Sequence, residues 1–389
     1  MTALRLAAGF LRMQPNLLHK DVGQLPLHLS RELGWPSDLV YWMEEDFDLI
    51  VPPDYSRWVR RVPVSVSPSR ARHTLMFLNY VRRHARSIDV LLVYHLTSES
   101  LFNIALYKAL NPRGVAVLKL DMDHRALVGF EPSPLLSKRR ALMKLFASSP
   151  VDLLTIETEW MYERLLPHVT RMGHELHVLP IGVDCEDPID IQPVVAAKEN
   201  VVLTAGRLGT VQKNAEQVLE AIERLRAETL GDWQFWFVGT RSAGFDDRLA
   251  RLLRRRPEFA ARIQTRDFVS SREELSAIYR RARVFCLTSR WESFGIVLAE
   301  AAYNGCYLVS TDVGAAPELT DRGQQGQLVP VEDAGGLAQA LERIITGSVR
   351  TESAALWAHS NVKTNYNWPK VARRLGDLVD RCRSRRSTA

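Results

Sequence analysis

Residues 285–330 read FCLTSRWESFGIVLAEAAYNGCYLVSTDVGAAPELTDRGQQGQLVP, and this stretch decides the fold of the chain. The run at 284–287 is apolar without alternation, as is typical of a parallel strand covered on both faces. A sharp turn with Glu292 follows. A helix then begins near Phe294 and ends at Gly305. Strand, turn and helix in this order indicate an α/β unit.

The turn after this strand is a candidate ligand site. Glu292 lies at the carboxyl end of the strand, where ligands collect in open parallel sheets. Free N–H groups near Phe294, Gly295 and Ile296 attract oxyanions, and Gly295 lets the backbone approach closely. Glu300, in the second helical turn, lies about 12 Å from Glu292 at the usual helical rise. Because paired glycosidase carboxylates are only ~5–9.5 Å apart, the two glutamates fit the two ends of one long ligand better.

This E-x7-E element with its FG turn resembles the retaining glycosyltransferases of family 4, or group 1, which have the two-domain GT-B architecture. Upstream, residues 201–225 (VVLTAGRLGTVQKNAEQVLEAIERL) resemble that family's glycine-arginine turn, with a lysine near the start of the next helix. Downstream, GQLVPVEDAGGLAQALERI is similar to its closing segment. PIGVDCEDPIDIQP resembles its PNGVD linker, except that Ile181 replaces the asparagine, whose role we therefore do not carry over.

Length and patterning indicate two domains. A chain of 389 residues exceeds what one core usually supports, and apolar strands alternate with helical segments twice over. We expect two doubly wound, Rossmann-like α/β domains facing across a cleft, with an acceptor domain at 1–183 and a donor domain at 184–360. The resemblance implies that a helix in 361–389 packs back on the first domain before a basic tail; spacing alone equally allows an ordinary last helix of the second domain. The expected strands are 4–10, 87–94, 115–120, 153–156 and 177–179, then one from 201, 234–238, 262–265, 284–287 and 307–310.

Composition narrows the compartment. Hydrophobic content of 46% fits a globular protein, and the four cysteines are widely spaced without a CxxC pair, so neither a zinc site nor a disulfide framework is indicated. We expect a cytoplasmic protein. The stretch ALRLAAGFLRM has only a short apolar run between Arg5 and Arg12 and no convincing cleavage motif, so we interpret it as the first strand rather than a signal peptide. No segment approaches the roughly 20 apolar residues that span a bilayer.

The net charge of +6 is clustered. Such clusters can hold anionic lipid at the inner face of a membrane; the alternative, which we favour somewhat, is solvated helix faces. No aromatic-interleaved basic motif accompanies them, so we expect no nucleic-acid partner. The clusters are Arg82, Arg83 and Arg86; Lys138, Arg139 and Arg140; Arg251, Arg254, Arg255 and Arg256; and Arg381, Arg383, Arg385 and Arg386.

Two cations follow the first strand of the second domain. Arg207 comes after Gly206, and Lys213 lies just before a helix that starts near Asn214, so both charges can face one crevice. By resemblance they bind the donor diphosphate. A leaving nucleoside diphosphate gains negative charge as the glycosidic bond breaks, and fixed cations stabilise that change. These two residues would replace a metal ion, and we expect neither a metal nor another cofactor.

The resemblance also implies roles around the FG turn. Glu292 would accept hydrogen bonds from hydroxyls of the donor sugar, and Glu300 from the ribose, while backbone N–H groups of 294–296 contact sugar or phosphate. The sequence departs from the family at Ser293, where many relatives have glycine. It departs again at residues 266–268, near the expected base site, so the resemblance does not carry over a nucleobase.

The first domain offers weaker candidates. KLDMDHR places Asp121, Asp123 and His124 directly after an apolar strand, where relatives often carry a histidine near the reacting sugar. The resemblance implies that one of the three faces that sugar. The alternative is a metal-binding DxD, which we disfavour because Arg207 and Lys213 already supply counter-charge. Gly23 stands in an early loop, in place of the family's double glycine, and would let that loop approach the phosphates or the acceptor. Other polar residues after apolar strands, which we interpret as ordinary strand ends, are His95, Glu99, Glu157 and Glu159.

The resemblance therefore implies a metal-independent glycosyltransferase of the hexosyltransferase type. It would move a sugar from a nucleotide-diphosphate sugar to a hydroxyl of a glycan, lipid-linked or small-molecule acceptor in glycan biosynthesis, with retention of anomeric configuration. Two alternatives stay open. One is a phosphorylase or epimerase on the same fold, and the other is a non-catalytic binding subunit.

Overall fold

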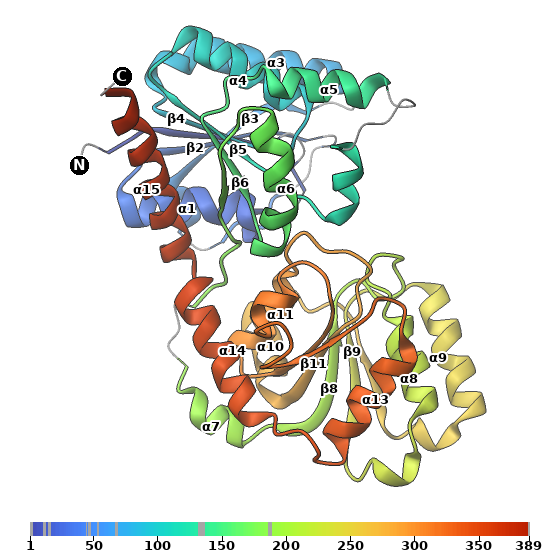
Figure 1. Cartoon of the computed structure of the whole chain (residues 1–389). Coiled ribbons are helices and arrows are strands. Elements are labelled where there is room, and N and C mark those ends of the chain that lie inside the picture. The colour runs from blue at the N-terminus through green and yellow to red at the C-terminus, as the bar shows by residue number, and fades with distance from the viewer. Residues whose placement is uncertain are drawn as a thin grey trace. The chain divides into compact units, whose positions relative to one another are not determined.

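The chain divides into two compact units, each built around one parallel sheet. The computed structural model describes residues 3–10, 13–14, 17–43, 45, 48–52, 54–66, 69–130, 137–185 and 189–387. One unit is formed by Met1–Gly182 together with Trp368–Ala389, and the other by Val183–Asn367. In both units helices cover the two faces of the sheet (Figure 1). The helix that returns to the first unit begins at Trp368, whereas the sequence placed this return at 361.

The sheet of the first unit has seven strands. They are β1 (Leu6–Phe10), β2 (Ser37–Met43), β3 (Val59–Val66), β4 (Val90–Tyr94), β5 (Val115–Lys119), β6 (Leu153–Ile156) and β7 (Leu176–Val178). Their order is β3-β2-β1-β4-β5-β6-β7, and neighbours pair in parallel. Every residue of β4 and β5 is buried, which explains their unbroken apolar runs because a parallel sheet is covered on both faces.

Two sets of helices cover this sheet. They are α1 (Asp21–Leu33), α2 (Tyr55–Trp58), α3 (Arg70–His84), α4 (Ser98–Leu110), α5 (Ser137–Ala147), α6 (Glu159–Arg171) and α15 (Trp368–Ser387). Apolar side chains of α3, α4, α5 and α6 join one core cluster with the strands. Helices α1 and α15 pack on each other (Figure 1). There the Trp368 ring stacks on His28 at 6.0 Å, and Arg373 pairs with Glu32 at 2.5 Å.

The second unit has a six-stranded parallel sheet. Its strands are β8 (Glu199–Ala205), β9 (Gln234–Val238), β10 (Ile263–Arg266), β11 (Ala282–Leu287), β12 (Tyr307–Thr311) and β13 (Gln327–Val329), in the order β10-β9-β8-β11-β12-β13. Its helices are α7 (Ile191–Ala196), α8 (Glu216–Arg224), α9 (Ala243–Arg255), α10 (Arg272–Arg281), α11 (Ile296–Tyr303), α12 (Ala316–Leu319), α13 (Ala334–Ile345) and α14 (Glu352–Asn365). Helices α8, α9 and α13 share one core with the sheet, and α10, α11 and α14 lie on its other face (Figure 1).

The ten strands expected from apolar runs all occur, with ends shifted by a few residues. Three further strands were missed. Strand β3 carries exposed arginines and Pro63, because an edge strand tolerates a residue that cannot donate to a ladder. Strand β2 is fully buried but begins with Ser37 and Asp38, and the edge strand β13 has only three residues.

Two features bear on the expected compartment. Within the described ranges, no helix combines the length and the apolar character needed to cross a bilayer. The four cysteines are free thiols, and Cys286 and Cys306 are buried.

Candidate functional site

The candidate site lies where the strand order of the second sheet reverses. From β8 the chain proceeds to β9 and β10 on one side and then returns to β11 on the other. The loops that follow β8 and β11 therefore lie side by side at the carboxyl edge, which is where open α/β sheets bind ligands. Backbone contacts join the two loops. Arg290 N donates to Gln212 O at 2.8 Å, and Thr288 Oγ1 donates to Asn214 O at 2.9 Å.

Lys213 and Glu292 form the centre of this site. Lys213 Nζ donates to Glu292 Oε1 at 2.5 Å, and Ser289 Oγ donates to the same oxygen at 2.6 Å. Both side chains are well shielded, with 16% of Lys213 and 8% of Glu292 exposed. A pair this shielded is held in place and screened less by salt than a surface pair. The fold thus brings together two of the residues that the sequence singled out on separate loops.

Arg207 stands at the rim of the same loop. Its side chain is exposed, and its Nη2 donates to Gln212 Oε1 at 2.8 Å. Gln212 in turn donates to the carbonyl of Trp291 at 3.2 Å, so an amide that the sequence reasoning overlooked links Arg207 to the loop that carries Glu292. Because its guanidinium reaches solvent, Arg207 can reorient toward an anion at little cost in burial.

The turn into α11 has the backbone that the sequence predicted. Gly295 has φ +91°, a left-handed conformation that glycine adopts without steric penalty, and α11 begins at Ile296. The Phe294 side chain is buried and packs against the Tyr366 ring, with 5.8 Å between the ring centres. Only the backbone of Phe294 is therefore available to contact a ligand. The Phe294 carbonyl accepts from Ala315 N at 2.8 Å, which ties the turn to the loop after β12.

Glu300 has its own set of partners, distinct from those of Glu292. Tyr279 Oη donates to Glu300 Oε2 at 3.4 Å. Burial raises the pKa of Glu300 to about 7, against the smaller opposing effects of Arg272 and Tyr279. A carboxyl group with this pKa exists in both protonation states near neutral pH, and a ligand hydroxyl that donates to it favours the charged form.

Glu300 should make folding stability depend on pH. Its pKa in the folded state lies above the value of 4.5 for a free glutamate, so between these values the folded state binds the proton more tightly. The stability contributed by Glu300 is therefore complete below about pH 4.5 and is lost as the pH rises toward about 7. We expect the melting temperature of the ligand-free protein to fall relative to that of Glu300→Gln across this window. Calorimetry at several pH values tests this, and parallel curves for the two proteins would contradict it.

The three candidate site residues after β5 differ in their contacts and in their exposure. Asp123 caps the 3-10 helix η3 (His124–Gly129), and its carboxylate accepts from Arg125 N at 2.9 Å and Arg125 Nη2 at 2.6 Å. Burial would raise the pKa of Asp123, but these bonds outweigh it and lower the pKa. Asp121 and His124 are exposed, and the His124 ring meets the edge of Trp160 at 6.2 Å. Asp123 therefore has a local structural role, and Asp121 and His124 are the more accessible members.

Gly23 lies inside helix α1 and not in a loop, which corrects the expectation for its setting. A methyl group there would come within 2.5 Å of Leu18 Cα and closer still to the Leu18 carbonyl oxygen. The Gly23 carbonyl accepts from Tyr55 Oη at 3.2 Å. Close packing of the helix on the backbone before it therefore accounts for this glycine.

Substitution of Gly23 should accordingly destabilise the protein. We expect Gly23→Ala to cost about 1–3 kcal/mol, because backbone atoms cannot yield to the added methyl group. Gly244→Ala is the matched control, since Gly244 also lies in the first turn of a helix and its nearest neighbour would be 3.8 Å away. Urea denaturation of both variants measures the difference. Equal stabilities would contradict the packing explanation.

Sequence reasoning missed a buried charge cluster in the first unit. Lys119 Nζ, at the end of β5, lies 3.0 Å from Asp21 Oδ2 and forms an ion pair with Glu157, which follows β6. Lys119 and Glu157 are each 1% exposed. Burial alone would lower the pKa of Lys119, but the carboxylates outweigh it and raise the pKa, so Lys119 stays charged. A lysine at the end of an otherwise apolar strand was the available signal.

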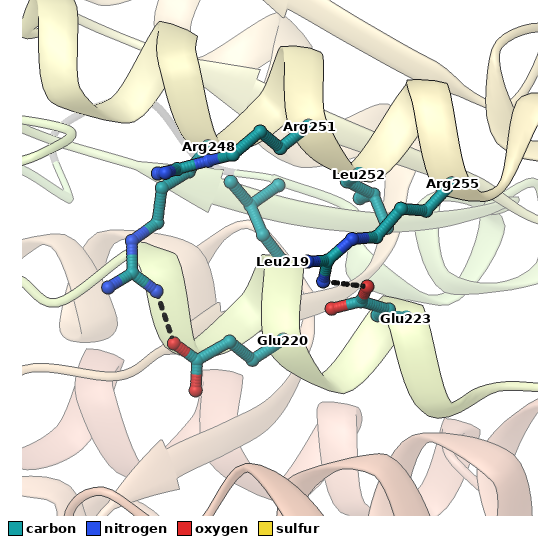
Figure 2. A pocket seen from close by; sticks show the side chains of 7 residues that line it. All are labelled: Leu219, Glu220, Glu223, Arg248, Arg251, Leu252 and Arg255. Carbon is teal, nitrogen blue, oxygen red and sulfur yellow. Dashed lines mark hydrogen bonds and ion pairs between the residues drawn. The ribbon is translucent and has the colours of Figure 1, made fainter.

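Two hollows in the described structure lie away from the predicted residues. One, of about 250 Å³, lies between α8 and α9 and is lined by Leu219, Glu220, Glu223, Arg248, Arg251, Leu252 and Arg255. Figure 2 shows its arginines Arg248 and Arg255 paired with Glu220 and Glu223. The other lies in the first unit beside α15. Across the described residues, no three His, Cys, Asp or Glu side chains gather as metal ligands would.

Comparison with known proteins covers the second unit best. Residues 199–347 match the family model described as glycosyl transferases group 1. Phosphatidyl-myo-inositol mannosyltransferase of Mycolicibacterium smegmatis is 29% identical over 208 residues, which are 52% of this chain and 51% of that protein. Glycogen synthase of Mycobacterium tuberculosis is 32% identical over 99 residues, which are 25% of this chain. The chain thus matches between 23% and 53% of the length of such curated relatives.

Solved structures match nearly the whole chain. Sucrose-phosphate synthase from Thermosynechococcus elongatus has a TM-score of 0.72 at 17% identity, covering 97% of this chain and 98% of that one. At this identity the likeness shows the fold alone. The expectation of two Rossmann-like domains in the GT-B arrangement of elements is confirmed.

Proposed function

We propose that this chain, whose residues 199–347 match the group 1 glycosyltransferase family model and which has the GT-B fold, transfers a sugar from a nucleotide-diphosphate sugar to an acceptor hydroxyl. The observation that carries the proposal is the shielded Lys213–Glu292 pair at the switch point of the second sheet. It combines a phosphate-binding cation with a carboxylate that accepts from sugar hydroxyls, on adjacent loops. The Anabaena protein HepE, whose structure holds UDP-glucose, has a TM-score of 0.66 to this chain.

In this proposal the donor spans the site. Lys213 and Arg207 bind the diphosphate, Glu292 accepts hydrogen bonds from the sugar, and Glu300 accepts from the ribose. Backbone N–H groups of 294–296 contact sugar or phosphate. Lys213 exchanges part of its contact with Glu292 for a phosphate oxygen when the donor binds, which leaves the Glu292 carboxylate free to accept from a hydroxyl.

We propose that the reaction retains the anomeric configuration and needs no metal ion. The bond between the anomeric carbon and the leaving phosphate oxygen breaks, and a bond to the acceptor oxygen forms on the same face. The acceptor proton passes to the leaving phosphate. Lys213 and Arg207 stabilise the charge that develops on the diphosphate, as preorganised cations do at a transition state. The coupling constant of the anomeric proton in the product distinguishes retention from inversion.

The first unit would supply the acceptor contacts. Asp121 and His124 are exposed polar residues after β5, and the acceptor would be a glycan, a lipid-linked sugar or a small molecule. The cysteine spacing supports a cytoplasmic location. Peripheral contact with the inner face of a membrane through the basic clusters is part of the same proposal; of these, Lys138 and Arg139 have side chains outside the described ones.

A thermal-shift screen tests the donor half of the proposal. Uridine, guanosine and adenosine diphosphates and their sugars are added to the purified protein, once with EDTA and once with Mn²⁺. We expect one donor to stabilise the protein, by about 2.7 kcal/mol at one hundred times its dissociation constant, equally in both conditions. Stabilisation that appears only with Mn²⁺ would contradict metal independence. Stabilisation by no nucleotide would favour a non-catalytic subunit.

The Glu300→Ala variant should lose much of this stabilisation, because a ribose hydroxyl then has no carboxylate acceptor. Glu228→Ala is the matched control, since Glu228 is exposed in the same unit. An unchanged nucleotide response in a folded Glu300→Ala protein would remove Glu300 from the site.

A further inference from the structure

The hollow beside α15 lies at the edge of the first sheet opposite the predicted site residues. Its volume is about 310 Å³. One wall comes from the segments that enter β6 and β7, so it lies at the amino ends of those strands, whereas Asp121, Asp123 and His124 follow the carboxyl end of β5. The other wall is one face of α15. Lining residues are Val151, Asp152, Leu153, Gly173, His174, Glu175, His177, Leu378, Arg381, Cys382, Arg385 and Arg386.

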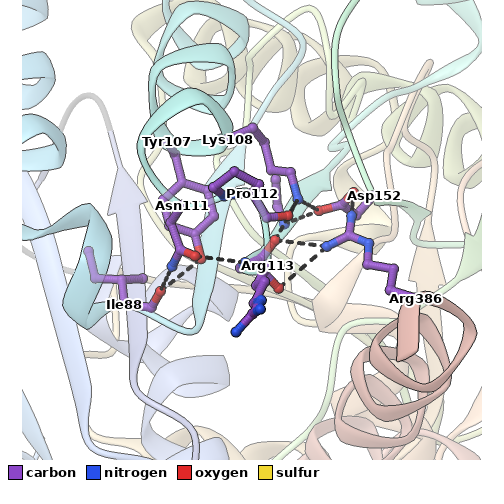
Figure 3. Close-up of polar contacts among 10 residues, drawn as sticks. Ile88, Tyr107, Lys108, Asn111, Pro112, Arg113, Asp152 and Arg386 are labelled. Carbon is purple, nitrogen blue, oxygen red and sulfur yellow. Dashed lines mark hydrogen bonds and ion pairs between the residues drawn. The ribbon is translucent and has the colours of Figure 1, made fainter. Parts of the chain in front are cut away.

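Positive charge exceeds negative charge in this hollow. Three arginines face two carboxylates among the lining residues, and both carboxylates are already engaged. Asp152 pairs with Arg386 and also with Lys108, whose Nζ lies 3.1 Å from Asp152 Oδ2. Figure 3 shows Lys108 and Arg386 converging on Asp152 from separate helices. One carboxylate thus serves two cations, which leaves a net positive charge beside it.

The second carboxylate, Glu175, is engaged as well. Its Oε2 accepts from Arg385 Nη1 at 2.6 Å, and its Oε1 lies 3.5 Å from His177 Nε2. Within the described part of the chain, Arg381 has no ion-pair or hydrogen-bond partner. It lies four residues before Arg385 on the same face of α15, and both residues line the hollow.

Titratable groups around the hollow respond to this excess. Burial lowers the pKa of His177; Glu175 opposes this shift, and nearby arginines, Arg381 among them, add to it. Burial together with Arg386 lowers the pKa of Lys108 to about 8. In both cases the neighbouring arginines act in the same direction as burial.

We propose that this hollow binds a phosphate group, carried by a free phosphate ester or by a lipid headgroup, with Arg381 and Arg385 as its principal ligands. Arginine presents paired N–H groups that match phosphate oxygens. A volume of about 310 Å³ equals roughly ten water molecules and lies at the lower end for small-molecule sites. It accommodates a phosphate with a short alcohol. This site is separate from the proposed donor site and does not depend on it.

The test uses Cys382, which lines the hollow and is half-buried, as a local reporter. Iodoacetamide alkylation of Cys382 is followed by mass spectrometry, with inorganic phosphate or glycerol phosphate replacing chloride at constant ionic strength. We expect protection of about tenfold at ten times the dissociation constant, since only the unliganded fraction reacts. Absence of protection by either anion, together with no binding to the vesicles described below, would overturn the proposal.

Charge reversal separates a local site from the overall charge. Arg381→Glu should abolish protection, whereas Arg254→Glu should retain it, because Arg254 is exposed in the other unit and the net charge changes equally. Arg381→Gln serves as a milder variant if the reversal fails to fold, as judged by thermal denaturation. Equal protection in Arg381→Glu and wild type, or equal loss in Arg254→Glu, would also overturn the proposal.

Vesicles distinguish the two sources of phosphate. Sedimentation uses phosphatidylcholine vesicles with and without phosphatidic acid. Binding that requires phosphatidic acid, and that Arg381→Glu loses while Arg254→Glu keeps, identifies a lipid headgroup. Protection by glycerol phosphate without vesicle binding identifies a free phosphate ester. Vesicle binding that survives in Arg381→Glu, with no protection of Cys382 by phosphate, would contradict the site in either form.

Discussion

Lys213→Ala should reduce the rate of sugar transfer by about 10²-fold or more, because loss of one preorganised contact to a developing charge typically costs that much. Lys213 is the shielded cation of the candidate site, 2.5 Å from Glu292 and 16% exposed. Few other charges can replace it, since Arg207 lies at the rim and bonds to Gln212. We expect the fall mainly in kcat, because the diphosphate carries most charge at the transition state.

Initial rates with the donor identified by thermal shift measure this effect. Lys363→Ala is the matched control, since it makes the same substitution at an exposed lysine of the same unit and should leave the rate unchanged. Glu292→Gln should also lower the rate strongly. Because the two residues are in contact, the double variant should lose less than the sum of the two single losses. A folded Lys213→Ala protein with a near-normal rate would refute the proposed site.

Lys119→Met should destabilise the first unit by about 3–5 kcal/mol, since removing one partner of a buried ion pair leaves an uncompensated charge. Lys119 is 1% exposed and pairs with both Asp21 and Glu157. It is the buried cation between the start of α1 and the end of β6, and its Nζ also lies 6.0 Å from the Tyr94 ring centre. Methionine fills similar volume, so the loss reports charge rather than a cavity.

Glu157→Gln is the informative partner variant. Burial raises the pKa of Glu157 and so disfavours its charged form, and Lys119 keeps Asp21 as a counter-ion when Glu157 is replaced. We therefore expect a much smaller loss, of about 1 kcal/mol. Hydrogen exchange of the β5 peptide in urea measures the stability of the first unit separately from that of the second. If Lys119→Met matched Glu157→Gln in stability, the cluster would not have the asymmetry that its contacts indicate.

Local sequence pattern was sufficient to predict many of the strands and turns of the second unit. Apolar runs predicted β9 and β12, and the strand, turn and helix order predicted the entry into α11, where Gly295 adopts a left-handed conformation. These features depend on neighbouring residues along the chain: a strand covered on both faces must be apolar throughout, and a positive φ favours glycine. Strand β3 was not predicted, because an edge strand need not be apolar throughout. Its Pro63 and its arginines interrupt the apolar pattern.

Long-range contacts were beyond that reasoning. Position along the chain marked Lys213 and Glu292 as neighbours of one crevice, but the 2.5 Å contact across 79 residues arises only because β8 and β11 pair at the switch point. Gly23 was assigned to a loop by resemblance to the family's early glycine loop, yet helix packing on Leu18 is what requires it. The Lys119 cluster joins residues from three distant segments. Periodic patterns of apolar residues do not predict such a long-range contact.

Fold class was therefore readable from residue order, since it depends on apolar runs and turns within short windows. The roles of the donor-side candidates were implied by the family resemblance and stay predictions. The tertiary structure alone determined which charged side chains are in contact and which are shielded from solvent. It also determined that a hollow forms beside α15. The physical reason is that charge interactions depend on distance and burial in space. Folding sets both the distance and the burial of these charges when it brings remote strand ends together. The sequence alone therefore does not predict them.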